Sequence, residues 1–421
     1  MKFNIITLGC KVNTYESNVM RDILVDNGFE EVDKDADIYI INTCTVTNTS
    51  DNKSLKELRR IKREYPNSIV IICGCMTQVR NDLDEIDANI IIGNKGKSDI
   101  VNLINEYKLN NKKIIKVNDI MNTSFEKMQL NNFNRTRAFV KIEDGCDNFC
   151  SYCIIPYARG GVRSKLPQDV LAEVNTLVSN GHKEIVLTGI HTGHYGADLD
   201  NYSFADLLSE LVKIEGLERI RISSIEMNEL NEDVLEILKN NEKIVSHLHI
   251  PIQSGSDEIL KLMNRKYLKK EFIEKINEIR SIRPDINITT DLIVGFPGET
   301  EELFQETLDT VDKIRFSKIH VFPFSLRKGT KAEELPNHLD DVTKKNRVKV
   351  LINKSQELEK EYMKKYIGKE IIFIPEVYRD GYLIGHTGNY LLIKYKGEED
   401  LLHSDVKVIG KEVDYPYLIC E

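Results

Sequence analysis

The sequence predicts an α/β protein with a doubly wound parallel-sheet domain, a partial βα barrel and a small all-β domain. Two separate series of short apolar strands alternate with amphipathic helices, which favours parallel sheets. The last fifty residues instead carry short strands separated by glycine turns, which is typical of a small β module. At 421 residues, the chain is long enough for about two or three such domains.

The first alternating series predicts a domain over residues 1–115. Short strands that alternate with helices in this way indicate an open sheet with helices on both faces. The stretch 108–131 is polar and rich in Asn and Lys, and we expect a linker with one short strand there. The predicted strands are Phe3–Leu8, Ile38–Ile41, Ile69–Cys73 and Ile90–Ile92, and the predicted helices are Glu16–Asn27, Ser50–Tyr65 and Ser98–Tyr107.

The second series predicts a domain over residues 132–358. Six strand–helix units indicate a partial (βα)6 barrel, by analogy with the full eightfold barrel. A charged helix over 341–367 is expected to pack back on it. The predicted strands are Ala138–Ile142, Glu184–Leu187, Arg219–Ser223, His247–Ile252, Ile286–Ile293 and Lys318–Phe322, and the helices between them are 167–180, 203–214, 231–239, 270–282 and 300–313.

The third predicted domain, residues 364–421, has the size of an OB-like barrel. Its strands are predicted at Ile371–Ile374, Tyr382–Gly385, Tyr390–Lys396 and Val406–Ile409.

Composition limits where the protein works and what it binds. The net charge of −9 argues against a generic polyanion binder, so any nucleic-acid site must be a local patch. No apolar run approaches the length of a membrane span, and no signal peptide is visible. The eight cysteines are grouped in motifs rather than spread as a disulfide framework, which favours a reducing cytoplasm and predicts a cytoplasmic protein without a membrane partner.

The most informative motif is the C-x3-C-x2-C triplet of Cys146, Cys150 and Cys153. Three thiolates at this spacing can hold three irons of a cubane cluster and leave the fourth iron open. Zinc is disfavoured because a structural zinc site usually takes four ligands, and no second pair follows nearby. Inert buried thiols are the other alternative, although three cysteines in eight residues are improbable by chance. The triplet follows the first barrel strand, at the carboxyl edge where such barrels keep their chemistry.

A second set of cysteines follows three strands of the first domain. Cys10, Cys44 and Cys75 each come at a strand end, and parallel strands end at one edge of a sheet. They therefore hold a second cluster or are buried core thiols. From their positions alone, these two interpretations are about equally probable. Cys73 lies one step deeper in its strand and is expected to be core, whereas Cys420 is expected to be incidental.

The triplet, with an aromatic residue before its last cysteine, resembles the signature of radical S-adenosylmethionine (SAM) enzymes. The whole chain resembles the radical SAM methylthiotransferase family, whose C-terminal β domain is of the TRAM type. The segments LGCKVNTYES, NTCTVTN, TGIHTGHYG and HLHIPIQSG, which begin at Leu8, Asn42, Thr188 and His247, are most similar to the branch that acts on N6-threonylcarbamoyladenosine at position 37 of tRNA.

The resemblance implies two 4Fe–4S clusters and SAM as cofactors. Cys10, Cys44 and Cys75 would hold the cluster that carries the sulfur, and Cys146, Cys150 and Cys153 the cluster that cleaves SAM. One SAM would methylate the sulfur, and a second would yield the deoxyadenosyl radical that activates C2 of the adenine. A radical route suits this bond because it is too inert for acid–base chemistry. The expected partners are tRNA that contains the threonylcarbamoyl base, an electron donor such as a flavodoxin or ferredoxin, and a source of sulfur.

Polar groups and glycines at the barrel strand ends are candidates for binding SAM. For each residue the alternative is a turn or capping role that satisfies the backbone. The candidates are Tyr152, Gly189, Glu226, Gln253 and Asp291. His191 and His194 flank a glycine turn, and they either read the substrate or face solvent, the second being favoured slightly.

Three groups of residues are candidates for contacting tRNA, although a basic run is more often a solvated helix face. They are the helix with Lys53, Lys56, Arg59, Arg60, Lys62 and Arg63, the stretch with Arg159, Arg163 and Lys165, and the β module with Tyr382, His386, Asn389, Tyr390 and Lys394.

Other functions remain open at this point. The same chemistry on isopentenyl-adenosine or on a ribosomal protein side chain is the nearest alternative. A non-catalytic iron–sulfur sensor that binds RNA would need no SAM pocket, and a zinc-dependent RNA-binding protein would be colourless.

Overall fold

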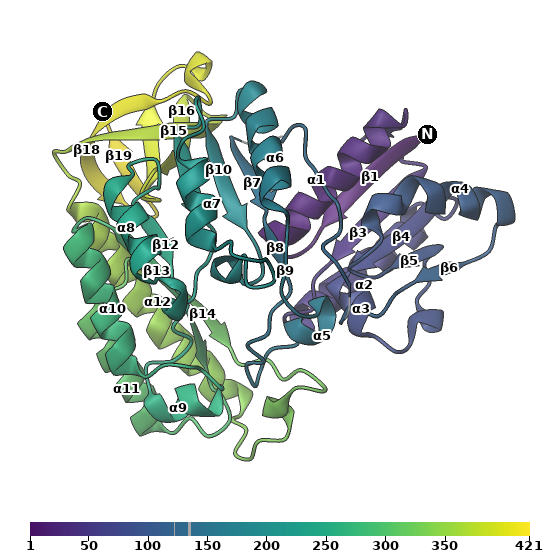
Figure 1. The fold of residues 1–421 in the computed structure, drawn as a ribbon. Helices are drawn as coiled ribbons and strands as arrows, with labels where there is room; N and C mark the ends of the chain where they lie inside the picture. The colour runs from purple at the N-terminus through teal and green to yellow at the C-terminus, as the bar shows by residue number, and fades with distance from the viewer. Residues whose placement is uncertain (122, 134–135) are drawn as a thin grey trace.

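The computed structural model describes residues 1–121, 123–133 and 136–421. Residue 122, in the predicted linker, and residues 134 and 135, at the start of the predicted barrel domain, lie outside the described residues. The N-terminal sheet and the C-terminal β-barrel flank a central α/β barrel on different sides (Figure 1). This arrangement confirms the predicted fold class.

The N-terminal domain is a six-stranded parallel sheet in the order β2-β1-β3-β4-β5-β6. Its helices cover both faces, because α1 and α4 pack Met20 and Ile104 on one side and α2 packs Leu58 on the other. The strands are β1 (Lys2–Thr7), β2 (Glu30–Glu31), β3 (Ile38–Thr43), β4 (Ile69–Gly74), β5 (Ile90–Ile92) and β6 (Ile114–Lys116), and the helices are α1 (Lys11–Asp26), α2 (Asn48–Glu64), α3 (Cys75–Val79) and α4 (Ile100–Asn110).

The central barrel consists of two three-stranded parallel sheets, β11-β10-β7 and β12-β13-β14. A bridge between Ile220 and Ile244 joins them, so that six strands follow one another around an incomplete barrel. Its strands are β7 (Arg137–Lys141), β10 (Glu184–Thr188), β11 (Arg219–Ile222), β12 (His247–His249), β13 (Asn287–Val294) and β14 (Lys318–Pro323). Its helices are α5 (Ile155–Arg159), α6 (Pro167–Ser179), α7 (Phe204–Leu211), α8 (Glu232–Asn240), α9 (Asp257–Leu262), α10 (Lys269–Ile282) and α11 (Glu301–Ile314), and β8 (Glu143–Asp144) pairs with β9 (Arg163–Ser164) beside them.

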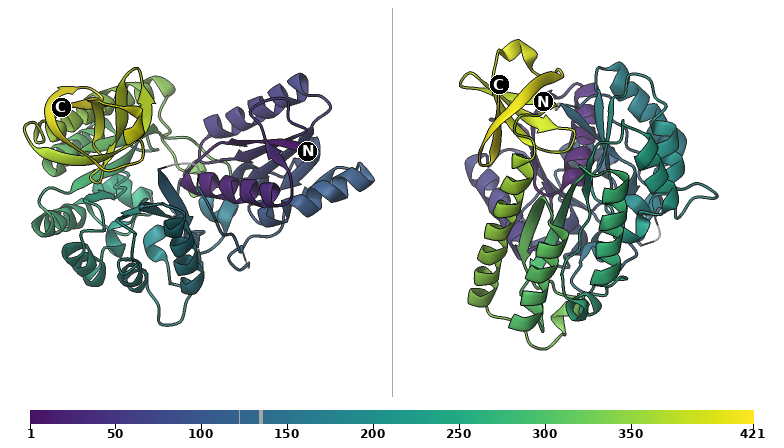
Figure 2. Two further views of the ribbon diagram at one scale, coloured as in Figure 1. Left: turned by 90° about the horizontal axis from the view of Figure 1, so that it is seen from above. Right: turned by 90° about the vertical axis from the view of Figure 1, so that its left-hand side faces the viewer.

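Helix α12 (Asp341–Lys364) packs against β14, where Ser355 accepts a hydrogen bond from the backbone of Ile319 at 2.9 Å. It leads into a closed five-stranded barrel in the order β15-β16-β17-β19-β18. The strands are β15 (Glu370–Arg379), β16 (Tyr382–Thr387), β17 (Leu392–Lys396), β18 (Val406–Asp414) and β19 (Tyr417–Cys420). The views of Figure 2 show this module against the central barrel, on the side away from the N-terminal helices.

The predicted elements differ from the structure mostly at their ends. Helix α1 begins at Lys11 rather than Glu16, because Cys10 already serves as its N-cap. Strand β12 ends at His249 rather than Ile252. Three short helices, after Gly74, Ile154 and Ser256, were not predicted, and neither were the two-residue strands β2, β8 and β9 or the last strand. Cys420 is buried in β19 and belongs to the core of the β-barrel.

No helix among the described residues has the length and apolar character that a membrane crossing requires.

Candidate functional site: two cysteine triplets at facing strand ends

The three N-terminal cysteines meet at the carboxyl edge of the parallel sheet. Cys10 follows β1, Cys44 follows β3 and Cys75 follows β4. A Cβ on Gly9 would lie 2.9 Å from the Cβ of Cys44, which shows how closely these loops approach. Burial raises the pKa of Cys44 to about 11, and the neighbouring Cys75 and Cys10 thiols add to that shift. The topology therefore gathers three thiols at one desolvated place.

Two glycines allow this approach. Gly9 and Gly74 have φ angles of 129° and 109°, in a region that favours glycine. A Cβ on Gly74 would lie 2.5 Å from the carbonyl oxygen of Thr43. The turn from β4 into α3, which presents Cys75, therefore depends on the absence of a side chain at residue 74.

The second triplet lies in the loop between β8 and α5. The backbone N–H of Cys146 donates to Gly160 at 3.0 Å, and that of Cys153 donates to Cys150 at 2.9 Å. Burial raises the pKa of Cys153 to about 12, with the Cys150 thiol adding to the shift. Burial also raises the pKa of Cys146, and the other two thiols contribute to that rise.

In each triplet, one cysteine lies next to the side chain of an arginine. The Nε of Arg159 lies 3.3 Å from the Sγ of Cys75, and a terminal nitrogen of Arg265 lies 3.5 Å from the Sγ of Cys150. Guanidinium groups next to sulfur stabilise thiolates, which are the form that binds metal. Three soft sulfur donors per site and a cationic neighbour fit an iron–sulfur cluster with three cysteine ligands.

A buried charge network joins the two triplets. Helix α5 begins just after Cys153 and ends at Arg159, which reaches Cys75 in the other domain. The carboxylate of Glu16 contacts Arg159 at 2.9 Å and Lys141 at 2.8 Å, and it also pairs with Lys97. Burial alone would raise the pKa of Glu16, but these three cations hold it well below its usual range.

Asp144 forms the second centre of this network. It contacts Lys141 at 2.6 Å, Arg159 at 3.0 Å and Arg163 at 3.6 Å. The network thus contains four cations (Lys97, Lys141, Arg159 and Arg163) and two carboxylates, an excess of two positive charges beside Cys75. Such an excess offsets the negative charge that three cysteine thiolates would bring into a desolvated site.

Arg327, which follows β14, holds the loop of Cys44 in place, as Arg159 does for Cys75. Its guanidinium donates to Thr45 and Asp51 at 2.7 Å each, and to Asn48 at 2.7 Å. Two barrel arginines therefore hold two of the cysteine loops of the N-terminal domain. Sequence reasoning missed this network, because its members are isolated charges whose pairing depends on the tertiary structure.

Three of the predicted SAM residues lie close to the second triplet. Glu226 pairs with Arg265 and lines a cavity of about 220 Å³ that also reaches Cys150. Gly189 sits against Glu143, and a Cβ there would lie 2.6 Å from a carboxylate oxygen of that residue. Tyr152 packs edge-on against Phe296, with ring centroids 6.3 Å apart. Their roles in binding SAM remain predictions.

The other two predicted SAM residues are neighbours in the second half of the barrel. The backbone N–H of Gln253 donates to the carbonyl of Asp291 at 3.0 Å, and Gln253 has a positive φ of 69°. The carboxylate of Asp291 lies 3.3 Å from the imidazole of His249. The structure thus brings this pair together, although sequence reasoning did not single out His249.

Several predicted tRNA contacts are corrected by the structure. Arg159, Arg163 and Lys165 are buried in ion pairs, so they are not a surface for phosphates. Their charges face carboxylates inside the protein, which their sequence context did not reveal.

In the β module, Tyr390 faces the central barrel rather than solvent. Its ring lies 4.8 Å from the ring of His247 and 4.7 Å from the guanidinium of Arg221. Asn389 is also part of this interface, since its carbonyl accepts a hydrogen bond from Asn287 at 2.6 Å. His386 is held by Glu376 at 2.7 Å and packs on the Tyr390 ring. Tyr390 and Asn389 therefore join two domains, and His386 supports the Tyr390 ring from within the β module.

Most of the other residues that were predicted to contact tRNA carry charges that solvent can reach. In α2, Lys53, Lys56, Arg59 and Arg63 are exposed, whereas Arg60 pairs with two glutamates of its own helix. In the β module, Lys394 lies over the Tyr382 ring at 4.5 Å. The expectation that both His191 and His194 face solvent is wrong for His191, which is buried.

Comparisons with known proteins agree with this geometry. Residues 140–311 match the radical SAM superfamily, and residues 2–93 match an uncharacterized protein family, UPF0004. The threonylcarbamoyladenosine tRNA methylthiotransferase MtaB of Bacillus subtilis is 43% identical over 98% of this chain and 94% of that protein. The chain belongs to the radical SAM methylthiotransferase family.

Members of this family are transferases that use SAM and 4Fe–4S clusters. The MtaB protein of Aquifex aeolicus is 38% identical over 95% of this chain and 98% of its own length. A tRNA-2-methylthio-N(6)-dimethylallyladenosine synthase of Clostridium botulinum is 36% identical over 97% of this chain and 94% of that enzyme.

Among solved structures, the radical SAM methyltransferase TsrM of Kitasatospora setae is similar with a TM-score of 0.57 at 14% identity, covering 79% of this chain and 76% of TsrM. This likeness shows the fold alone.

Proposed function

We propose that this enzyme converts N6-threonylcarbamoyladenosine at position 37 of tRNA to its 2-methylthio derivative. The observation that carries the proposal is the 43% identity, over nearly the full length, to a methylthiotransferase named for that base. The facing cysteine triplets, joined through Arg159, support the same reaction, because it needs two metal clusters close together.

Cys146, Cys150 and Cys153 would hold the cluster that works with SAM. When bound, that cluster supplies the electron for reductive cleavage of SAM. The loop of these cysteines is fixed by a backbone hydrogen bond from Cys146 to Gly160 and by Arg265 beside Cys150. Glu226 holds Arg265 in that position, and Tyr152, Gly189, Gln253 and Asp291 are proposed to orient SAM at the strand ends.

Cys10, Cys44 and Cys75 would hold the cluster that supplies the transferred sulfur. At this site Cys44 and Cys75 are buried, whereas Cys10 is exposed. Arg159 orients Cys75, and the network around Glu16 holds the two domains in register. Exclusion of water protects reactive species, which is what radical chemistry requires of an active site.

The proposed partners follow from the same reaction. They are tRNA carrying the threonylcarbamoyl base, a reductant such as a flavodoxin or ferredoxin, and a sulfur source, all in the cytoplasm. The exposed cations of α2 are the proposed phosphate contacts, because they lie on the helix that follows Cys44.

A reconstituted assay separates this substrate from its nearest alternative. The cluster-loaded enzyme is incubated with SAM, dithionite and either of two tRNAs, one with threonylcarbamoyladenosine and one with isopentenyl-adenosine. We expect a methylthio product only on the first. A product only on the second would overturn the substrate and keep the chemistry.

A further inference from the structure

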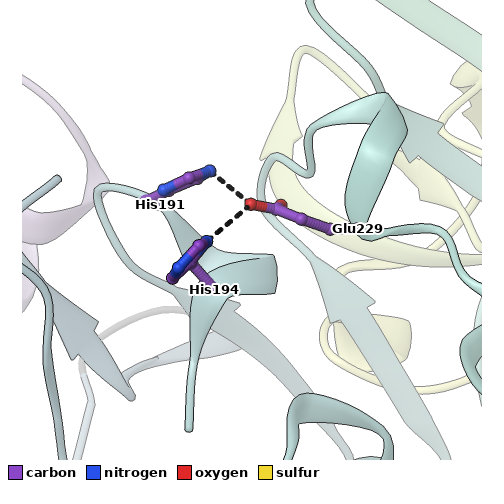
Figure 3. Close-up of side chains that lie close together, drawn as sticks. All are labelled: His191, His194 and Glu229. Atoms are coloured by element: carbon purple, nitrogen blue, oxygen red, sulfur yellow. Dashed lines mark ion pairs between the residues drawn. The ribbon is translucent and has the colours of Figure 1, made fainter. Parts of the chain in front are cut away.

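Two histidines and a glutamate converge on one another (Figure 3), and they line the cavity that also reaches Cys150. His191 and His194 come from the loop after β10, where η3 spans Thr192–His194, and Glu229 ends η4 (Met227–Glu229) after β11. One ligand atom from each side chain lies within 4.8 Å of the other two. The two imidazole rings are stacked, with centroids 4.8 Å apart and planes at 24°.

The glutamate is held so that one oxygen is presented to both rings. Its Oε2 accepts the backbone N–H of Glu226 at 3.0 Å, which fixes the carboxylate. Its Oε1 contacts the Nε2 of His191 and lies 3.7 Å from the Nδ1 of His194, as Figure 3 shows. Gly193 separates the histidines, and a Cβ there would clash with the Glu229 carboxylate. The loop is therefore shaped to bring both rings onto Oε1.

The surroundings leave one carboxylate oxygen that a cation would satisfy. Within the described chain, Oε1 of Glu229 is buried and makes no hydrogen bond of ordinary geometry, although it lies against the Nε2 of His191 and 3.7 Å from the Nδ1 of His194. His191 is only 7% exposed, so its ring is largely shielded from bulk solvent. The triad opens into the cavity of about 220 Å³ that also contains Asn148 and Asn228, where water can complete a coordination shell.

We propose that His191, His194 and Glu229 bind one divalent first-row transition metal ion, such as Zn²⁺ or Fe²⁺. Two imidazoles and one carboxylate are a ligand set that these ions take in proteins, with positions left open for water or a substrate group. The hydrogen bond that fixes Oε2 of Glu229 is the kind of supporting interaction that orients a metal ligand. This site consists of nitrogen and oxygen donors, so it is distinct from both cysteine triplets, and the proposal does not depend on which base the enzyme modifies.

The test adds zinc to the cluster-loaded enzyme under anaerobic conditions, removes excess by desalting, and measures zinc and iron together by mass spectrometry. Zinc K-edge absorption then reports the ligands. We expect about one zinc per chain, with a nitrogen and oxygen shell at about 2.0–2.1 Å and imidazole scattering. The changes His194→Gln and Glu229→Gln should each weaken zinc binding at least about tenfold, with the iron content unchanged.

His338→Gln is the matched control, since it removes an exposed imidazole remote in sequence from the triad. His194 is half-exposed, so its replacement should leave the fold intact, and circular dichroism checks this. Two outcomes overturn the proposal. One is a sulfur shell at about 2.3 Å, which would place zinc on cysteines. The other is zinc content that is absent in the wild type or equal in His194→Gln and His338→Gln.

Discussion

The guanidinium of Arg159 in the central barrel donates a hydrogen bond to the Sγ of Cys75 in the N-terminal domain, at 3.3 Å. Arg159 follows the second cysteine triplet by six residues and is completely buried. One side chain thus connects the loop of one triplet to a thiol of the other. The distance between the two triplets is therefore set by the packing of α5 against the sheet edge.

Replacement of Arg159 should destabilise the enzyme strongly. The change Arg159→Gln leaves Glu16 and Asp144 with fewer cations in a buried site, which costs about 3–5 kcal/mol for a broken buried pair. Denaturation in guanidinium chloride, followed by circular dichroism, measures the loss. Arg60→Gln in α2 is the control, because its pairs with Glu57 and Glu64 are at the surface and should contribute less than about 1 kcal/mol. Equal stability of the two variants would contradict the role of the network.

Cys73 in β4 and Cys75 at the start of α3 should behave in opposite ways. Cys75→Ala should remove about four irons per chain from an enzyme that carries about eight, because one 4Fe–4S site is lost. Cys73→Ala should keep the iron, since Cys73 packs in the core with Ile71 and Ile92 and burial raises its pKa to about 12. Iron and sulfide analysis after anaerobic reconstitution decides this. Loss of iron in Cys73→Ala with retention in Cys75→Ala would reverse the assignment.

A methyl group at Gly74 should also prevent binding of the cluster that is proposed for Cys10, Cys44 and Cys75. In Gly74→Ala the new Cβ meets the Thr43 carbonyl at 2.5 Å and the Asn42 side chain at 2.9 Å, so the turn that presents Cys75 must move. We expect the iron content to fall by about half, as in Cys75→Ala. Gly28→Ala is a matched control, because Gly28 also has a positive φ, of 80°, but has open space where the Cβ would go. If both alanine variants retain full iron, close packing at Gly74 is not needed for the site.

The free energy of unfolding should fall in mild acid because His247 is buried. Burial lowers the pKa of His247 well below its usual value, and Arg221, His249, Lys11 and His320 lower it further. The unfolded chain takes up a proton near pH 6.5 and the folded chain does not, so this contribution is complete above about pH 6.5 and is lost as pH falls. The slope approaches about 1.4 kcal/mol per pH unit for one proton.

Denaturation of the wild type and of His247→Asn between pH 5 and pH 8 measures this slope. Asn keeps a polar group near Thr289, which His247 contacts at 3.2 Å, but it does not titrate. We expect a shallower pH dependence in His247→Asn and no change of slope in His338→Asn. Parallel curves for the wild type and His247→Asn would show that another group is responsible.

The sequence predicts the strands of both α/β domains well, because runs such as Ile69–Gly74 are continuous and apolar and are bounded by charged helices. It also places all six cysteines that are proposed to hold clusters at strand ends or in one loop. Short helices such as Cys75–Val79 escaped prediction, since five residues carry no helical period. The last strand, Tyr417–Cys420, lacks the alternation that marks a strand and forms through pairing with β17 and β18.

The contacts around the cysteines could not be predicted, for a physical reason. Glu16, Lys97 and Arg159 are far apart in the sequence, and each is ordinary in its local context. A basic residue after a cluster motif favours an interpretation as a nucleic-acid contact, because charges are seldom buried without partners. Only the packing of α5 on α3 reveals that Arg159 has such partners.

The central claim is tested most directly by mass spectrometry of tRNA nucleosides from cells with and without this gene. We predict that the methylthio form of threonylcarbamoyladenosine disappears when the gene is deleted, that its unmodified parent accumulates, and that the gene returned on a plasmid restores the product. The Cys75→Ala variant should fail to restore it. Persistence of that nucleoside while a different methylthio nucleoside disappears would contradict the proposed substrate.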